Sequence, residues 1–498
     1  MRINQSITLL CATLATVYTA SVNVSSLSPA LAVCPVLSTY PSGVSSTVNL
    51  FPVQATPTIS SDLFTIQYST QAKLITNTLT GEQYILNLNG NPNKADNNTF
   101  GVSLNSNVRT FTIPFQHVCI AETLVETYIE MLGERSSILY DVLDYTTSPC
   151  IILAGKEGLI NPYNSTDNTK CDAVWGNTAT NDASAGGGNN VISFSVDLAT
   201  TMLGRAEWIK FVSAFYDKEA AAVAIYNSIQ SRYNNLKSLA QQAAANNKQV
   251  IAWIAYNPAY TSATYNSSTS YTVSTAAYKQ NLTGDAGAIF FTPPASYNST
   301  NGYSSAVELF DALQAGNVTQ VIDETYAYIY NANGTASDAF TSYNTWLQYI
   351  NITSAAASKY AFLQHVWRDD KSQTATNLTA GIPGQDDWFE SAYPNADAVL
   401  ADVVSFVQPS VEPNYNTRWF RSLNNGTPVT IIATCPTPSD LSAPSIPILD
   451  PNNQTEYSTV QCPTFLTQPQ SLLATSNADT NTISYILATT LATAVLLM

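Results

Sequence analysis

The run KEAAAVAIYNSIQSRYNNLKSLAQQAAA, residues 218–245, carries the longest helical pattern in the chain. Its apolar residues recur three or four positions apart and form one stripe: Ala222, Ile225, Ile229, Tyr233, Leu236, Ala240 and Ala243. Asp217 precedes the run and can cap it. At ~1.5 Å per residue the helix would span ~40 Å, the width of a domain. We therefore expect residues 217–246 to form a bracing helix between two lobes.

Strand and helix patterns alternate on both sides of this helix, which is typical of α/β layers. Before it, alternation over 64–86 predicts a β-hairpin that turns at Thr80-Gly81, and further patterns predict strands at 110–113, 117–120 and 137–143 and a helix at 123–132. After it we expect strands at 250–256, 288–292 and 325–330 and helices at 306–314, 338–350 and 396–406. The sequence thus predicts an α/β protein with two Rossmann-like lobes, an N-terminal lobe with the hairpin over 34–216 and a C-terminal lobe over 247–425.

The charge balance excludes several classes of function. The chain has 19 Lys and Arg against 35 Asp and Glu, a formal net charge of −16, and only 11% of its residues are charged. Nucleic-acid binding needs cationic contacts to phosphates, so it is not expected. The chain has 2 histidines, which excludes His-rich metal sites and leaves little room for a Ser-His-Asp triad. No GxSxG, HExxH, GxGxxG or P-loop pattern occurs, and we expect no cofactor.

Both ends of the chain indicate a place outside the cell. Residues 1–20 have the layout of a secretory signal peptide, with cleavage near Ala20 or after Ala30-Leu31-Ala32. Residues 476–498 end in an apolar tail and resemble a glycosylphosphatidylinositol (GPI) attachment signal, with Asn477 as the candidate residue and Ala474 and Ser476 as alternatives. A tail anchor is the other interpretation, although the apolar run is short for a bilayer span. Residues 426–475 are rich in Pro, Ser and Thr and are typical of a stalk.

Sequons and cysteines agree with secretion. Asn-x-Ser/Thr occurs at Asn97, Asn164, Asn266, Asn281, Asn298, Asn317, Asn333, Asn351, Asn377, Asn425 and Asn453, which predicts a glycosylated surface. Removal of the signal peptide leaves Cys34, Cys119, Cys150, Cys171, Cys435 and Cys462. Six cysteines allow 15 connectivities. Cys150–Cys171 and Cys435–Cys462 are the plausible local disulfides. No CxxC motif occurs, so the cysteine spacing gives no indication of zinc or redox chemistry.

Four phrases, in order, resemble the substrate-binding proteins of bacterial iron-complex importers, which bind ferric siderophores, haem or cobalamin. IPFQHVCIAETLVETYIEMLG at 113–133 is similar to their first strand and helix, and DYTTSPCI at 144–151 to the loop after their second strand. LGRAEWIKF at 203–211 resembles the head of their long helix, and DDWFESAYPNADAVLADVV at 386–404 their closing segment. Bacterial members are held by an N-terminal lipidated cysteine, whereas here Cys34 lacks that context and the expected anchor is C-terminal.

The resemblance implies that a ligand lies in the cleft between the lobes and is held by loops beyond the carboxyl ends of strands. That rule selects Glu122, Thr123 and Tyr145 in the first lobe, and Tyr256, Tyr260, Tyr328, Trp367 and Arg368 in the second. Arg205 is either a ligand contact or the partner of Glu207 in an ion pair. Aromatic side chains suit a flat or bulky organic ligand, and Arg368 could pair with an acidic group on it. We expect an iron complex of siderophore type or a related macrocycle. The sequence names no transporter partner.

Two other functions stay open. The chain could be a surface adhesion or wall protein that reuses the two-lobed scaffold. It could also be a carbohydrate-active enzyme, because Asp386, Asp387 and Glu390 supply the paired acids that glycoside hydrolysis needs. Neighbouring acids do not converge across one substrate, so a solvated helix start is the preferred interpretation of these residues. We therefore expect that the protein is not an enzyme.

Overall fold

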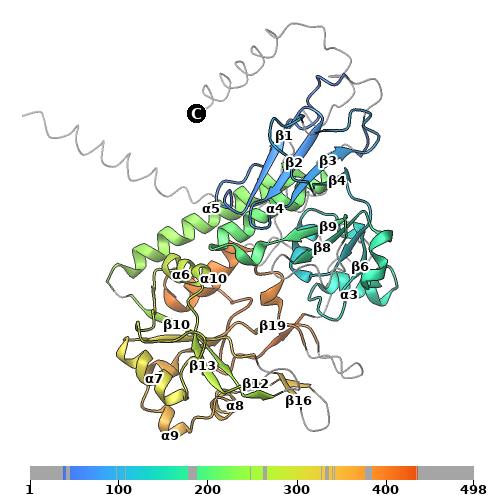
Figure 1. The fold of residues 1–498 in the computed structure, drawn as a ribbon. Coiled ribbons are helices and arrows are strands. Elements are labelled where there is room, and N and C mark those ends of the chain that lie inside the picture. Colours follow the sequence, from blue (N-terminus) through green and yellow to red (C-terminus); the bar gives the residue numbers. More distant parts are fainter. Residues whose placement is uncertain are drawn as a thin grey trace, which may run out of the picture.

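A computed structural model gives the structure of residues 38–40, 45–96, 98–106, 108–177, 188–246, 248–261, 266–326, 328–330, 336–338, 340, 342–375, 384–432 and 435. Two α/β lobes are joined by a long helix, α5 (Glu219–Ala243), as Figure 1 shows. This confirms the fold class predicted from the sequence. Within the residues just given, no helix is both long enough and apolar enough to cross a membrane. The signal peptide, the stalk beyond Cys435, Cys34, Cys462 and Asn477 lie outside the described residues.

A separate four-stranded sheet precedes lobe one. Its strands are β1 (Phe64–Tyr68), β2 (Ala72–Asn77), β3 (Gln83–Leu88) and β4 (Arg109–Ile113), in that order. β1, β2 and β3 pair antiparallel, and β4 runs parallel to β3. The predicted hairpin is therefore a three-stranded unit. Its first run breaks at Ser69, whose hydroxyl accepts the N–H groups of Gln71 and Ala72 and turns the chain. The turn expected at Gly81 is present, with φ of 72°.

Lobe one contains a five-stranded parallel sheet in the order β7-β6-β5-β8-β9. The strands are β5 (Val118–Ile120), β6 (Ile138–Asp141), β7 (Asn161–Pro162), β8 (Ala173–Asn177) and β9 (Val191–Phe194). The helices are η2 (Thr123–Val125), α2 (Glu126–Met131), η3 (Arg135–Ser137), α3 (Pro149–Lys156), η4 (Ser165–Lys170) and η5 (Val196–Leu198). The helix predicted over 123–132 thus begins with a 3-10 turn, and it ends where Gly133 has φ of 76°.

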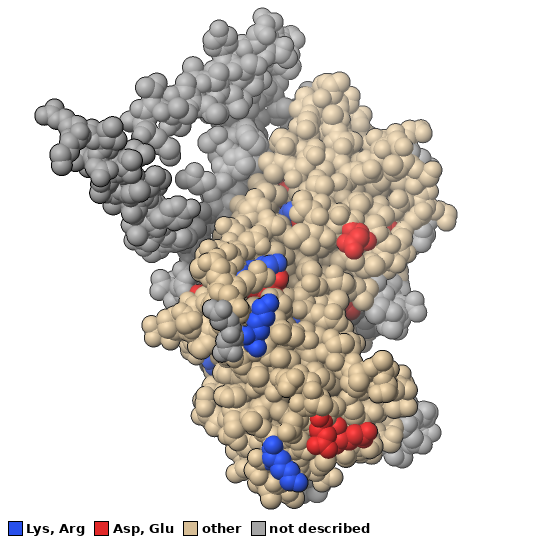
Figure 2. All heavy atoms as spheres, turned by 90° about the vertical axis from the view of Figure 1, so that its left-hand side faces the viewer, with Lys and Arg blue, Asp and Glu red and all other residues tan. Residues whose placement is uncertain are grey.

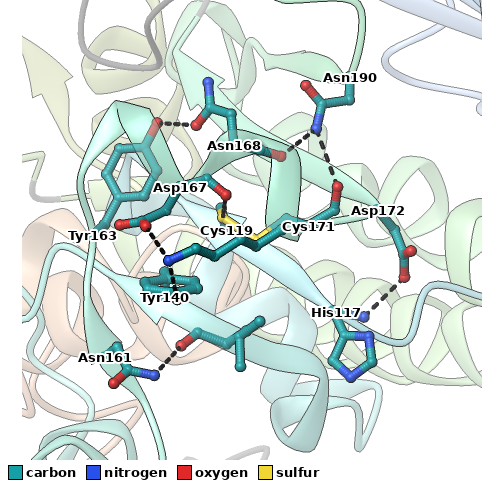
Figure 3. The surroundings of a disulfide bond; sticks show 12 residues. His117, Cys119, Tyr140, Asn161, Tyr163, Asp167, Asn168, Cys171, Asp172 and Asn190 are labelled. Atoms are coloured by element: carbon teal, nitrogen blue, oxygen red, sulfur yellow. Dashed lines mark hydrogen bonds and ion pairs between the residues drawn. A yellow bond between two sulfur atoms is a disulfide. The ribbon is translucent and has the colours of Figure 1, made fainter.

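The disulfides differ from the expected local pairs. Cys119 bonds Cys171, 52 residues away, and Cys150 bonds Cys435, 285 residues away. The first pair forms because Cys119 lies in β5 and Cys171 lies two residues before the neighbouring strand β8 (Figure 3). The second pair forms because the chain returns from lobe two to helix α3 of lobe one. Sequence proximity was a poor guide, since the sheet and the returning chain bring distant cysteines together.

The predicted bracing helix is α5, and a separate helix precedes it. α4 (Met202–Tyr216) ends at Asp217, which has a left-handed φ of 56°, and α5 begins two residues later. Asp217 therefore ends α4 and does not cap α5; its carboxylate binds Lys73 of β2 at 2.8 Å. The phrase LGRAEWIKF belongs to α4. At ~1.5 Å per residue α5 is ~37 Å long, and its buried stripe, which includes Ile229 and Tyr233, packs on α4 and on α10 of lobe two.

Lobe two is built on a sheet in the order β13-β10-β15-β18-β20, with β14 paired to β10. The strands are β10 (Val250–Asn257), β13 (Ser270–Val273), β14 (Ile289–Phe290), β15 (Gln320–Asp323), β18 (Val366–Arg368) and β20 (Arg421–Ser422). The helices are α6 (Ala277–Asp285), α7 (Ala306–Ala315), α8 (Tyr343–Tyr349), α9 (Ser354–Ala357), η7 (Ala361–Gln364), η8 (Asp387–Phe389) and α10 (Ala396–Val407). Small two-stranded sheets pair β11 (Tyr260–Thr261) with β12 (Asn266–Ser267), β16 (Tyr328–Tyr330) with β17 (Ala336–Asp338), and β19 (Ser372–Gln373) with β21 (Thr430–Ile431).

One predicted strand of lobe two was misplaced. The sheet uses β15, whose four residues are all buried, while the run predicted at 325–330 contributes only β16, in a two-stranded sheet. A strand buried on both faces reads as a short continuous apolar run, and QVID is too short to show one. The helix predicted over 338–350 is shorter in the structure. It is α8, which begins after Ser342 because that residue forms a capping box.

The surface carries few charges, as the face in Figure 2 shows. The described sequon asparagines that have a described side chain are all exposed: Asn164, Asn281, Asn298, Asn317, Asn351 and Asn425. Asn266 lies in β12, and Asn97, Asn333, Asn377 and Asn453 lie outside the described residues. The exposed positions are sterically open to sugars, and their glycosylation stays a prediction.

Candidate functional site

A pocket of about 460 Å³ lies between the two lobes. Lobe one lines it with Ala121, Glu122, Thr123, Val142, Tyr145 and Thr147, and lobe two with Tyr326, Gln385, Asp386, Phe389 and Glu390. The first group follows β5 and β6, and Tyr326 follows β15, so these residues lie beyond the carboxyl ends of parallel strands. The remaining residues come from η8, the two residues before it and Glu390 immediately after it. The volume is within the ~300–1,000 Å³ of small-molecule sites.

Three exposed aromatic rings gather at this pocket. Tyr145 and Tyr326 are each 64% exposed and Phe389 is 53% exposed. Among the aromatic side chains that the structure describes, only these three are exposed, and all three line the pocket. Elsewhere the described aromatic rings are buried or half-buried, as in the core of α4, where Trp208 and Phe211 pack 4.9 Å apart. Exposed apolar side chains that cluster in one place mark a binding site more often than scattered ones do.

Lobe one supplies the pocket residues that the sequence analysis selected. Glu122, Thr123 and Tyr145 all line the pocket, Glu122 and Thr123 as half-buried side chains. They lie together because β5 and β6 are neighbours and both strands end at the same edge of the sheet. That they contact a ligand stays a prediction.

Lobe two differs from expectation at Trp367 and Arg368. The Trp367 ring stacks on Phe406 of α10 with 4.2 Å between centroids, and its indole N–H donates to Gln320 at 3.0 Å. Arg368 is buried; its guanidinium binds the carboxylates of Asp323 and Asp370 and donates to the Thr325 carbonyl at 2.9 Å. Neither residue lines the pocket. Arg368 is the centre of an ion-pair network within lobe two and is already paired.

Arg205 does not pair with Glu207, and it does not line the pocket. Its guanidinium carbon lies 3.6 Å from the ring centroid of Tyr278 in α6 and 4.3 Å from that of Tyr393. This buried cation–π contact joins α4 to lobe two. Glu207 instead pairs with Lys210 at 2.8 Å and accepts backbone N–H groups of the 58–60 segment.

Tyr256, another residue selected in lobe two, does not line the pocket. Its half-buried ring lies 4.9 Å from that of Tyr271 and 5.5 Å from that of Tyr349, against the core of the lobe. The backbones of Tyr260 and Tyr328 lie in the two-stranded sheets β11–β12 and β16–β17. The sequence analysis applied the carboxyl-end rule to a misplaced strand, so it missed Tyr326.

Carboxylates of lobe two hold the loop that precedes α3 of lobe one. Glu390 accepts the N–H of Thr147 at 2.7 Å and that of Ser148 at 3.1 Å. Asp387 accepts the Thr147 hydroxyl at 2.9 Å. We call these bonds the interlobe contact. Both carboxyl groups are buried, so the interpretation of this segment as a solvated helix start is wrong. Because Thr147 and Glu390 line the pocket, the contact also forms one of its walls.

Comparison with known proteins gives likeness in structure only. No protein-family model matches the sequence, and no curated protein matches it. A possible iron-binding periplasmic solute-binding protein from Staphylococcus epidermidis shares 12% identity at a TM-score of 0.37, over 59% of this chain and 100% of that one. A periplasmic haem-binding protein from Pseudomonas aeruginosa shares 13% identity at a TM-score of 0.39, over 59% of this chain and 94% of that one. A Helicobacter pylori protein solved with Ni(II) bound shares 14% identity at a TM-score of 0.40, over 62% of this chain and 88% of that one.

Buried carboxyl groups lie beneath the lobe-one side of the interlobe contact. The Thr146 hydroxyl lies 3.1 Å from Glu126 and 3.4 Å from Asp141, and Ser148 donates to Glu130 at 2.9 Å. Burial raises the pKa of Glu126 well above its usual range, and the nearby charges of Asp141 and Glu390 raise it further. Burial also raises the pKa of Asp141 to about 7. No group of His, Cys, Asp and Glu within the described parts of the chain is arranged to hold a metal ion.

Five pocket residues of lobe two were not selected as ligand contacts: Tyr326, Gln385, Asp386, Phe389 and Glu390. Asp386 and Glu390 were weighed only as possible catalytic acids, and the phrase DDWFE in which they lie was interpreted as the start of a helix. The signal that could have found them is Phe389, an apolar residue between acids at a helix start, where a solvated segment gives no reason for one.

Proposed function

We propose that the protein is a cell-surface solute-binding protein that captures a small organic molecule in the pocket between its lobes. The single observation that carries the proposal is the gathering of Tyr145, Tyr326 and Phe389, the exposed aromatic residues of the described chain, around one interlobe pocket. Rigid aromatic side chains give a ligand a large contact area at a small entropy cost. An iron complex of siderophore type or a related macrocycle is the ligand class that the sequence resemblance suggests.

The competing functions explain these features less well. An adhesion protein that reuses the scaffold has no need for an open pocket, and a packed interface would cover the aromatic rings. For a glycoside hydrolase, the candidate acids are Asp386, Asp387 and Glu390. Two of them, Asp387 and Glu390, already accept bonds from Thr147, Ser148 and the Trp419 indole N–H.

The test is a ligand screen with the purified full chain. Melting temperature is measured with ferric hydroxamates, haem and cobalamin, because a ligand at ~100 times its Kd stabilises the folded state by about 2.7 kcal/mol. The double variant Tyr145→Ala, Phe389→Ala is the matched control and should melt like the parent but lose the ligand-induced shift. If no compound shifts the parent, or if the double variant keeps the full shift, solute binding in this pocket is wrong.

The proposal places the protein on the outer face of the cell. We propose that residues 1–20 are removed on secretion and that a lipid attached near Asn477 holds the stalk at the membrane. A phospholipase specific for inositol lipids should release the protein from intact cells, and truncation before Ile483 should send it to the medium. Retention on the cell after both treatments contradicts a lipid anchor.

A further inference from the structure

The described residues that line the pocket include acids and no base. Glu122, Asp386 and Glu390 are the acids, and none of the other described lining residues is Lys or Arg. Glu122 and Asp386 are half-buried and come from opposite lobes, whereas Glu390 is buried and occupied by the interlobe contact. Among the described lining residues, a ligand therefore meets carboxyl groups from both lobes and no cationic side chain.

Three cations of lobe two that belong to the charge network around Asp386 are already paired. Lys279 pairs with Glu324, Arg368 with Asp323 and Asp370, and Arg421 with Asp370. Asp369 lies in the same network, and burial raises its pKa. Arg421 donates to Asp370 and to the Phe340 carbonyl at 3.1 Å, so it is not available to an anion in the pocket.

Lobe one also places acids behind its side of the pocket. Glu126, Glu130 and Asp141 lie buried behind the loop of Thr147, and Arg135 pairs with Glu130 at 3.1 Å. Glu126 and Asp141 interact with each other, and burial raises the pKa of both carboxyl groups. A positive charge nearby favours the ionised form of such groups.

We propose that the ligand of this pocket carries net positive charge on a bulky organic frame, with the charge between Glu122 and Asp386 and the frame against Tyr145, Tyr326 and Phe389. The inference rests on the proposed function and narrows its ligand class. Aromatic faces attract cations, so the rings and the carboxylates favour the same sign of charge. An anionic ligand would instead lose its hydration without gaining a cationic partner.

The charge on Asp386 responds to such a ligand. Burial raises its pKa to about 7, and Asp370 adds to that, whereas the Gln373 amide, Arg368 and Arg421 act to lower it. Near neutral pH the group is therefore partly protonated. A cation beside it favours the ionised form and releases the proton.

The experiment uses one ferric trihydroxamate core with three terminal groups. Ferrioxamine B has a free amine and is cationic, its N-acetyl derivative is neutral, and its N-succinyl derivative is anionic. Affinity of the full chain for each is measured by titration calorimetry at low and at physiological salt. We expect the cationic form to bind about tenfold or more tightly than the anionic form, with the neutral form between them.

Variants separate the pocket acids from general surface charge. Glu122→Gln and Asp386→Asn should each reduce the preference for the cation, and Asp62→Asn, an exposed acid before β1, should leave it unchanged. Melting temperature checks that each variant is folded, and the ligand series in the parent protein needs no variant at all.

The outcomes distinguish this inference from the proposed function. Equal or tighter binding of the anionic form overturns the cationic ligand class and leaves solute binding intact. The same holds if haem, whose propionates are negative, or neutral cobalamin binds in preference to all three. If none of these compounds binds, both the inference and the proposed function are wrong.

Discussion

Glu390 of lobe two and Thr147 of lobe one are joined by a hydrogen bond of 2.7 Å, from the Thr147 N–H to a carboxylate oxygen. The other oxygen accepts the N–H of Ser148, so one side chain satisfies two backbone donors across the lobe boundary. The residues are 243 positions apart, and the bond therefore depends on how the lobes are assembled. It links pocket geometry to interlobe geometry, because both residues line the pocket.

Removing this carboxylate should loosen the lobes. Glu390→Gln keeps one acceptor oxygen but places an NH2 group opposite one of the two backbone N–H groups. One buried donor therefore loses its partner, and we expect the free energy of unfolding to fall by about 1.5–3 kcal/mol. Glu308→Gln is the control, since Glu308 also accepts a backbone N–H, from Ser304, but on the exposed face of α7. Urea unfolding measures both. Equal losses in the two variants would show that the interlobe position of Glu390 adds nothing.

The exposed aromatic residues should affect binding without affecting folding. Tyr326→Ala and Phe389→Ala remove ring area that contacts little protein, so we expect about a tenfold loss of affinity for any ligand found in the screen. Their melting temperatures should stay within about 2 °C of the parent. Leu239→Ala, at an exposed position of α5, is the control for loss of apolar surface elsewhere. A large drop in melting temperature with unchanged affinity would contradict the assigned pocket.

Arg368 should behave as a structural residue. Arg368→Ala leaves the buried carboxylate of Asp323 without its cation and Asp370 with Arg421 alone, and we expect a loss of about 3–5 kcal/mol in the free energy of unfolding. Lys170→Ala breaks the exposed pair with Asp167 and should cost about 0–1 kcal/mol. Denaturant titration of both variants measures the difference. Normal stability with weakened ligand binding in Arg368→Ala would restore the ligand contact that the sequence suggested.

The two disulfides should differ in their effect on stability. The closed segments are 285 and 52 residues long, and in the chain-entropy model the longer one stabilises by about 1.5 kcal/mol more. We therefore expect the double variant Cys150→Ala, Cys435→Ala to lose more stability than Cys119→Ala, Cys171→Ala. Unfolding in guanidinium chloride compares them. The reverse order would mean that packing around Cys119, rather than chain entropy, sets the cost.

Stability should fall as the pH rises through neutrality. The pKa of Asp141 is raised by burial to about 7, from ~3.9 in an unfolded chain, and Glu126, Glu130 and Arg135 are the titratable groups around it. Between about pH 4 and pH 7 the folded state holds a proton that the unfolded state has lost, so the free energy of unfolding decreases with pH. We expect a higher melting temperature at about pH 5 than at about pH 8.

A variant tests whether Asp141 contributes to this slope. Asp141→Asn cannot titrate, and its melting temperature should depend less on pH over the same range. Asp62→Asn, at an exposed position, should keep the slope of the parent. An unchanged slope in Asp141→Asn would assign the effect to other buried carboxyl groups.

The sequence predicted elements with strong periodicity and missed those decided by tertiary contacts. The stripe of α5 and the strand-helix unit at 118–131 were found because their apolar spacing is regular. The break at Asp217 was missed, because a left-handed residue that ends one helix looks like the cap of the next. β15 was missed because four buried residues give too short a pattern.

The same limits apply to the site. Glu122 and Tyr145 follow correctly predicted strands, so the carboxyl-end rule placed them at the pocket edge. Arg368 satisfied the rule as well, but its partner Asp323 becomes visible only when β15 and β18 lie side by side. Residue type and strand position selected candidates, and only the ion-pair network shows that Arg368 is already paired.

The Cys150–Cys435 bond has a mechanical consequence. Residues 151–434 form a covalently closed segment that contains α4, α5 and all of lobe two. Tension applied to the chain beyond Cys435 passes through the sulfur bridge to α3 of lobe one and cannot extend any residue inside the closed segment. In a protein tethered by its C-terminal side, the force would thus enter lobe one at α3 and bypass the backbone of lobe two, which supplies one wall of the pocket.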